Sequence, residues 1–199
     1  MEEPDRQRRV ALFGGTFDPV HSGHLEVAQQ AVRECELDQV IFLPCRQSPH
    51  KSVKAGASEE ERLRMLQRAT EGLPWAEVSD WEYHQAIPSF SWRTAEVFSE
   101  RLSGSQLFWL MGWDQWQVLP TWSRFPHLAT LVEFIVHARD GEGGEGVEHP
   151  GARAHFVAGN HPASSSLIRK RLEEGAEAPA GWLAPRVAEF VSERSLYRE

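Results

Sequence analysis

The segment Gly-Gly-Thr-Phe-Asp-Pro-Val-His-Ser-Gly-His places two histidines three residues apart, directly after a glycine turn. The two glycines let the backbone approach a ligand closely, because neither carries a Cβ. We expect a helix to begin near Ser22, which could cap it and would direct free N–H groups toward the same place. His21 and His24 would lie on one side of that helix start, where both can donate hydrogen bonds to phosphate oxygens. The pattern predicts polyphosphate binding and stabilisation of the charge that shifts during phosphoryl chemistry.

Two other interpretations of this histidine pair are weaker. A polar loop with surface histidines does not account for the order of glycine turn, Asp-Pro, His-x-Gly-His and helix start. A zinc site lacks both a third ligand and the glutamate spacing of a zinc protease. Asp18 is a weak candidate for a metal ligand, and a turn role beside Pro19 suits it better.

A second candidate segment is Ser-Ser-Ser-Leu-Ile-Arg, residues 164–169. It precedes an expected helix, so its hydroxyls and free N–H groups would face a ligand, with Arg169 on the first turn. Arginine offers a planar fork that suits phosphate oxygens. The alternative is a well-capped helix with a solvated arginine.

A third candidate segment, residues 43–51, contains Pro-His-Lys in a loop that its prolines keep from being helical. His50 and Lys51 would bring positive charge to an anionic nucleotide, although a solvated loop lysine is equally compatible with the sequence. Trp109, Trp113, Trp116 and Trp122 form a dense aromatic patch further along, in which Trp109 is expected to be core.

Alternating strands and helices must position these segments. Short apolar runs predict strands at 10–13, 40–43, 106–111, 131–137 and 153–158, and helical spacing predicts helices between and after them. This order predicts an α/β fold, a Rossmann-like, doubly wound, mostly parallel sheet with helices on both faces. Ligands bind outside the carboxyl ends of such strands, so residues 14–24, 43–51 and 111–114 should cluster at one edge. Residues 140–151 are glycine-rich and read as a surface loop.

Composition limits the classes of partner. The chain of 199 residues, with a formal charge of −8, suits one soluble domain. Its acidity argues against a nucleic-acid coat or an anionic membrane as partner. Two cysteines without a disulfide framework, no secretory signal and no long apolar run predict a reduced, cytoplasmic protein.

The motifs together resemble a known family. GGTFDPVHSGH looks like the phosphate-binding signature of the nucleotidyltransferase superfamily. FLPCRQSPHK, PSFSWRT, FWLMGWDQWQVLPTW and SSSLIRKRL with a terminal SLY occur in the order found in bacterial nicotinate-nucleotide adenylyltransferases, over about residues 10–197. The resemblance implies one nucleotidyltransferase domain over residues 1–199, with its core at about 8–197. It implies transfer of AMP from ATP to nicotinate mononucleotide, giving deamido-NAD and pyrophosphate, with Mg²⁺ bridging phosphate oxygens mostly through water.

The resemblance also assigns roles to residues of this chain. His21, His24 and Arg169 would act on the triphosphate during catalysis, with Lys51 assisting. The ATP-binding set would be Gly14, Gly15, Thr16, Phe17, His21, Gly23, His24, Gly112, Asp114, Ser164, Ser165, Ser166, Ile168 and Arg169. The mononucleotide-binding set would be Cys45, His50, Lys51, Ser91, Thr94, Trp122 and Ser123.

Some positions depart from the family pattern. Ser166 replaces a threonine but keeps the hydroxyl, Ser123 stands where tyrosine is common, and Cys45 stands where small or amide residues are usual. Trp113 occupies a position that is usually small or polar, and its ring could reshape either pocket.

Several alternatives therefore stay open. The enzyme could accept nicotinamide as well as nicotinate mononucleotide, or another acceptor such as pantetheine phosphate. A catalytically silent nucleotide-binding regulator is an alternative from another class, which the intact histidines and arginine disfavour. Exposed tryptophans could mark a contact between copies in a homo-oligomer.

Overall fold

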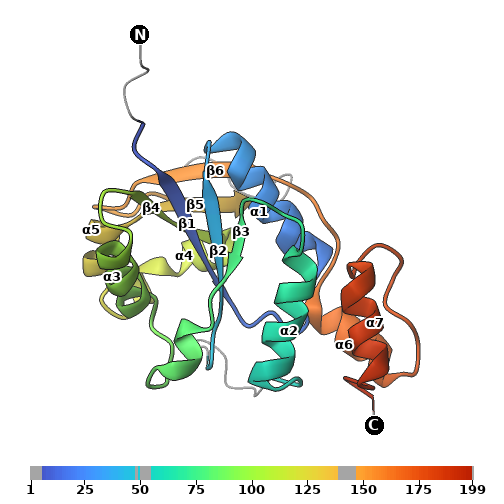
Figure 1. Ribbon diagram of the computed structural model, residues 1–199. Helices are drawn as coiled ribbons and strands as arrows, with labels where there is room; N and C mark the ends of the chain where they lie inside the picture. The colour runs from blue at the N-terminus through green and yellow to red at the C-terminus, as the bar shows by residue number, and fades with distance from the viewer. Residues whose placement is uncertain (1–5, 48, 50–54, 139–146, 199) are drawn as a thin grey trace.

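A six-stranded sheet forms the centre of the protein (Figure 1). The computed structural model describes residues 6–47, 49, 55–138 and 147–198. The strands are β1 (Arg9–Gly15), β2 (Gln39–Pro44), β3 (Ala76–Val78), β4 (Gln106–Gly112), β5 (Glu133–Ala138) and β6 (Ala154–Ala158). Their order is β3-β2-β1-β4-β5-β6, and every neighbouring pair is parallel. The sheet is thus doubly wound, and the direction of winding reverses between β1 and β4.

Helices cover both faces of this sheet (Figure 1). On one face lie α1 (Ser22–Glu34), α2 (Glu59–Thr70), α6 (Ser165–Glu173) and α7 (Pro185–Glu193). On the other lie α3 (Ser91–Arg101), α4 (Trp113–Gln117) and α5 (Phe125–Leu131). Two 3₁₀ turns, η1 (Trp81–His84) and η2 (Leu119–Thr121), complete the connections.

The central strands are buried on both faces, which explains their continuous apolar sequences. Along β1, Ala11 and Phe13 point to the α1 face, whereas Val10 and Leu12 point to the α3 face. All four side chains are less than a tenth exposed. Covering two faces in this way fixes the register of β1, because a shift of one residue would exchange its two side-chain sets.

The doubly wound α/β class predicted from the sequence is confirmed, with differences in detail. The predicted strand from residue 131 begins at Glu133, because Leu131 ends α5. The short β3 and α4 were not predicted. His21, not Ser22, is the residue that precedes α1, and the Ser22 hydroxyl instead donates to the Gly181 carbonyl. Of the predicted 140–151 loop, residues 140–146 lie outside the described part of the chain.

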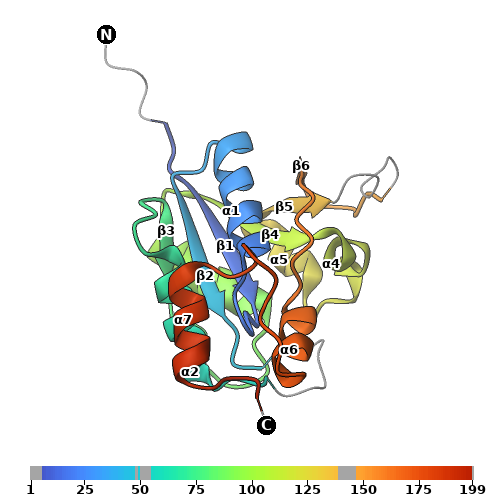
Figure 2. The same cartoon turned by 90° about the vertical axis from the view of Figure 1, so that its right-hand side faces the viewer.

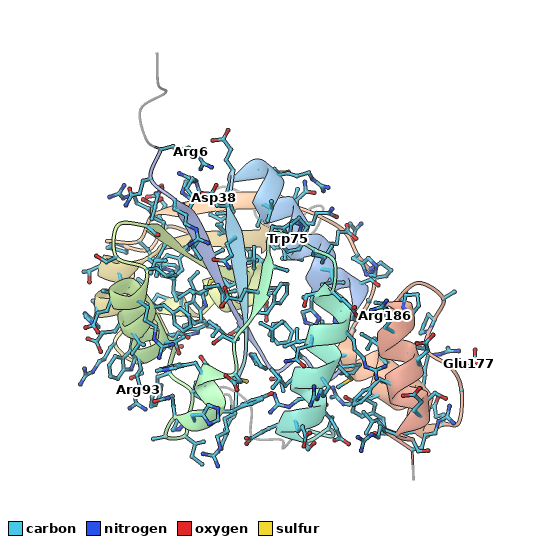
Figure 3. The ribbon with its side chains drawn as sticks, viewed as in Figure 1. Arg6, Asp38, Trp75, Arg93, Glu177 and Arg186 are labelled. Carbon is cyan, nitrogen blue, oxygen red and sulfur yellow. The ribbon has the colours of Figure 1, made fainter. Side chains whose placement is uncertain are left out.

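Ion pairs join the periphery of the fold (Figure 3). Arg6 pairs with Asp38 at the amino ends of β1 and β2, the sheet edge opposite to the predicted ligand site. Arg186 of α7 pairs with Glu71 at the end of α2, so the C-terminal helix is tied to the same face as α2. Within the described residues, no helix is long and apolar enough to cross a membrane.

Candidate active site

A cavity of about 280 Å³ opens at the carboxyl ends of β1 and β4. This is the point where the strand order reverses and where doubly wound sheets bind their ligands. The cavity is lined by Phe13, Gly14, Gly15, Thr16, Cys45, Pro49, Glu82, Ser89, Ser91, Trp109, Leu110, Met111, Gly112, Asp114, Gln115 and Trp122. The three segments expected to cluster at one edge all contribute to it.

Two tryptophans form an apolar wall of the cavity. The rings of Trp109 and Trp122 meet edge to face, with centroids 6.4 Å apart. Trp109 is almost fully buried, as expected of a core residue, yet it also lines the cavity. An aromatic wall of this kind can stack on a planar ring.

A buried carboxyl group, that of Glu82 in η1, also lines the cavity. Its side chain accepts hydrogen bonds from the hydroxyls of Thr94, at 2.7 Å, and Ser89. Burial nevertheless raises the pKa of Glu82, because desolvation outweighs the two hydrogen bonds. Thr94 is thus occupied with Glu82, while Ser91 reaches the cavity directly.

The glycine turn has a packing requirement. A Cβ on Gly15 would lie 2.8 Å from the ring of Phe17, which folds back beneath the turn. Phe17 is 2% exposed and contacts the ring of His24 with centroids 5.0 Å apart. Phe17 is therefore a packing residue that links the cavity to the histidine pair.

The two histidines stack at the start of α1, with ring centroids 3.7 Å apart. The backbone N–H of His21 donates to Nδ1 of His24 at 3.2 Å. Because Nδ1 accepts, the proton of a neutral His24 ring is on Nε2, which is thereby a hydrogen-bond donor. The fold thus selects one tautomer of His24.

His21 is neutral near pH 7. Burial of its ring lowers the pKa of His21 to about 4, and the neighbouring His161 contributes to this shift. The Nδ1 atom of His21 is buried and makes no hydrogen bond within the described structure. A ligand with negative charge would raise this pKa again, because it favours the charged imidazolium.

The N-terminus of α6 lies beside that of α1. In Figures 1 and 2, α6 lies just below the lower end of α1, and the Ser165 hydroxyl donates to the Pro19 carbonyl at 3.0 Å. Arg169 donates from Nη1 to the backbone oxygen of Asp18 at 2.5 Å and from Nη2 to Ser166 Oγ at 3.5 Å. Two helix N-termini, two imidazoles and a guanidinium thus converge, which favours an anionic group.

The remaining predicted residues have different placements. Ser164 precedes α6, whereas Ile168 is fully buried, so its side chain belongs to the core. Ser123 is exposed and does not line the cavity among the described residues. Trp113 packs its ring against Phe156 of β6 instead of entering the cavity. His50 and Lys51 lie outside the described residues.

Two buried residues, Arg62 and Asp18, hold the site together through contacts that the sequence does not predict. Arg62 of α2 is 1% exposed and donates from Nη1 to the carbonyls of Thr16 and Cys45, both at 2.8 Å. It therefore joins the turns that follow β1 and β2. Asp18, for which a turn role was preferred to a metal role, accepts three hydrogen bonds from neighbouring protein groups. The only signal for either residue is long-range contact, which a single sequence does not display.

A cavity at the switch point lies beside a cluster of two histidines and an arginine that suits phosphate. Together they define a nucleotide-binding α/β protein of the nucleotidyltransferase class. Consistent with this class, a family model described as cytidylyltransferase-like matches residues 12–171. A probable nicotinate-nucleotide adenylyltransferase of Methylacidiphilum infernorum is 34% identical over 195 residues, covering 95% of this chain and 92% of the relative. The nicotinate-nucleotide adenylyltransferase of Bacillus subtilis is 31% identical over 191 residues, covering 96% and 98%. The chain belongs to the cytidylyltransferase-like family and, within it, to the nicotinate-nucleotide adenylyltransferases.

The fold is also shared with solved structures. The Plasmodium falciparum nicotinic acid mononucleotide adenylyltransferase complexed with NaAD has a TM-score of 0.75 at 16% identity, over 96% of this chain and 98% of that one. A putative nicotinate-nucleotide adenylyltransferase of Vibrio parahaemolyticus has a TM-score of 0.70 at 18% identity, over 97% of each chain.

Proposed function

We propose that this protein transfers the AMP group of ATP to nicotinate mononucleotide, forming deamido-NAD and pyrophosphate. The observation that carries the proposal is the adjacency of two parts. One is an aromatic-walled cavity at the β1–β4 switch point, and the other is a cluster of two imidazoles and the Arg169 guanidinium at the N-termini of α1 and α6. The first suits a planar ring, and the second suits a triphosphate.

In this reaction, the 5′-phosphate of the mononucleotide attacks the α-phosphorus of ATP in line. A new P–O bond forms as the bond from the α-phosphorus to the bridging oxygen breaks, and negative charge moves onto pyrophosphate. Positioning and charge stabilisation supply most of the catalysis in such transfers, so no covalent nucleophile is needed.

The cluster provides donors for that charge. His24 offers Nε2–H, because its Nδ1 already accepts from the backbone. Arg169 donates to the backbone oxygen of Asp18 and to Ser166, and its side chain is still 29% exposed. His21 enters the reaction neutral and gains basicity as the phosphates approach, so it can hold a proton beside the departing pyrophosphate.

The cavity would hold the nucleosides. Trp122 would stack on the pyridine ring of the mononucleotide, with Trp109 behind it and Ser91 at the opposite wall. Asp114, which lines the cavity with its carboxylate beside Gly112, would contact the adenosine ribose. Cys45 lines the cavity with its thiol 3.7 Å from Thr16 Oγ1.

Mg²⁺ would enter with the triphosphate. Among the described residues, no group of three or more histidine, cysteine, aspartate or glutamate side chains could hold a metal ion. The carboxylate of Asp18 already accepts three hydrogen bonds. This donor set fits an ion that is bound chiefly by phosphate oxygens and water and that neutralises phosphate charge there.

The test is pyrophosphate release from ATP and Mg²⁺, with nicotinate and nicotinamide mononucleotide measured side by side. We expect release with the nicotinate form, and loss of it on Arg169→Ala or His24→Ala without loss of folding. Comparable release with both mononucleotides would replace the proposed specificity by dual specificity. Binding of ATP without release from either substrate would favour a nucleotide-binding regulator.

A further inference from the structure

Asp18 joins four segments that lie far apart in the sequence. Its carboxylate is 4% exposed and accepts hydrogen bonds from the backbone N–H of Gly56, at 2.8 Å, and of Ala57, at 3.0 Å. A third hydrogen bond comes from the hydroxyl of Tyr197, at 2.8 Å. Its backbone oxygen accepts the hydrogen bond from Arg169. The contact therefore connects the first turn of the site, the approach to α2, the helix α6 and the C-terminal segment.

The C-terminal segment contributes packing as well as a hydrogen bond. A Cβ placed on Gly56 would lie 3.1 Å from the ring of Tyr197 and 3.5 Å from Cδ of Arg169. The ring of Tyr197 and the stem of Arg169 thus pack on the same glycine. Both views place the C-terminus close to α6 (Figures 1 and 2). Burial and the charge of Asp18 raise the pKa of Tyr197, so its hydroxyl keeps the proton that it donates.

The distances around Arg169 show how the hydrogen bonds of Asp18 limit its ion pair with this arginine. Nη1 of Arg169 lies 3.7 Å from Oδ2 of Asp18, longer than the 2.7–2.9 Å that is usual for a charge-assisted hydrogen bond. The Asp18 carboxylate does not form a short ion pair with the Arg169 guanidinium, because it already accepts hydrogen bonds from two backbone amides and a phenol. Arg169 is therefore held by the backbone oxygen of Asp18 while its side chain stays 29% exposed.

We propose that Tyr197 and Asp18 are positioning residues for Arg169. By donating to the carboxylate, Tyr197 keeps Asp18 from closing a full ion pair with Arg169, and so keeps the guanidinium available to the triphosphate. Without that hydroxyl, the carboxylate lacks one donor and draws in Arg169, whose Nη1 lies 3.7 Å from Oδ2. This inference rests on the proposed function only in naming ATP as the anion, so ATP binding tests it without requiring turnover.

The experiment compares Tyr197→Phe with Tyr83→Phe. Tyr83 is the only other tyrosine, and its hydroxyl is also buried but makes no hydrogen bond within the described structure. Calorimetric titration with ATP should show that Tyr197→Phe weakens binding about tenfold, the worth of one hydrogen bond to a charged group. Tyr83→Phe should change it less than twofold. In turnover, the KM for ATP should rise while the KM for the mononucleotide stays within twofold.

A double-mutant cycle separates positioning from plain stabilisation. In the Asp18→Asn background, residue 18 has no charge to draw in Arg169, so adding Tyr197→Phe should weaken ATP binding less than twofold. A lower melting temperature with unchanged ATP affinity in Tyr197→Phe would overturn the proposal. An equal loss of affinity from Tyr197→Phe in both backgrounds would also overturn it. If the wild type binds ATP but releases no pyrophosphate, the proposed function fails, whereas the cycle still decides the role of Tyr197.

Discussion

The neutral state of His21 makes the stability of the protein depend on pH in a defined direction. In the unfolded chain, His21 binds a proton below its ordinary pKa of 6.5, whereas in the folded protein it does so only below about 4. Between these values the unfolded state holds more protons, so the free energy of unfolding rises with pH across this window. The contribution of His21 is fully present above pH 6.5 and is lost as the pH falls toward 4.

The size of the effect follows from the two pKa values. At about 1.4 kcal/mol per pKa unit, their separation corresponds to ~3 kcal/mol of unfolding free energy. Urea unfolding of the wild type and of His21→Gln, measured at pH 7 and at pH 4.5, checks this value. The wild type should lose on the order of 2–3 kcal/mol more than the variant, since glutamine does not titrate.

A matched control is His84→Gln, since His84 is exposed and pairs with Asp80 across one helical turn. Its stability difference between the two pH values should follow that of the wild type within about 0.5 kcal/mol. Equal pH dependence in wild type and His21→Gln would refute the reasoning. So would an NMR titration that places the pKa of His21 near 6.5.

Three further predictions concern residues around the same turn. Gly15→Ala should lower the unfolding free energy by about 1–3 kcal/mol in urea titrations, because its methyl group would overlap the ring of Phe17, and unchanged stability would contradict this packing. Arg62→Met should lower the unfolding free energy by about 2–4 kcal/mol and raise the KM for the mononucleotide, because two carbonyls at the ends of β1 and β2 lose their donor. A stable variant with wild-type KM would contradict this prediction. His161→Ala should raise the pKa of His21 in an NMR titration, because it removes a neighbouring positive charge, and an unchanged or lower pKa would show that burial alone sets the value.

The elements that the sequence predicts are those whose signals are local. The strands β1, β2 and β4 are apolar runs that end at glycine or proline, and a local capping box of Ser58 and Glu61 begins α2. By contrast, β3 spans three residues at the sheet edge and has no run long enough to recognise. The helix α4 spans five residues of a tryptophan-rich stretch, which is too short to show helical periodicity.

The site residues likewise fall into two groups, those with a local sequence signal and those held by long-range contacts. Sequence spacing predicts the turn at Gly15, the pair His21 and His24, and the arginine of α6. In each case one turn or one helix start brings the groups together. Arg62 and the Asp18–Tyr197 contact do not, because the partners lie 46 and 179 residues apart in the chain. Such pairs become visible only once the sheet has placed the segments side by side.

The most direct test of the proposed reaction is to identify the product of the purified protein by mass spectrometry. With ATP, Mg²⁺ and nicotinate mononucleotide, we predict deamido-NAD and pyrophosphate in equal amounts, with no dinucleotide when ATP is omitted. Binding of ATP with no dinucleotide formed from this substrate would contradict the central claim, and it would leave the two histidines and Arg169 as a phosphate site that serves a different acceptor or none.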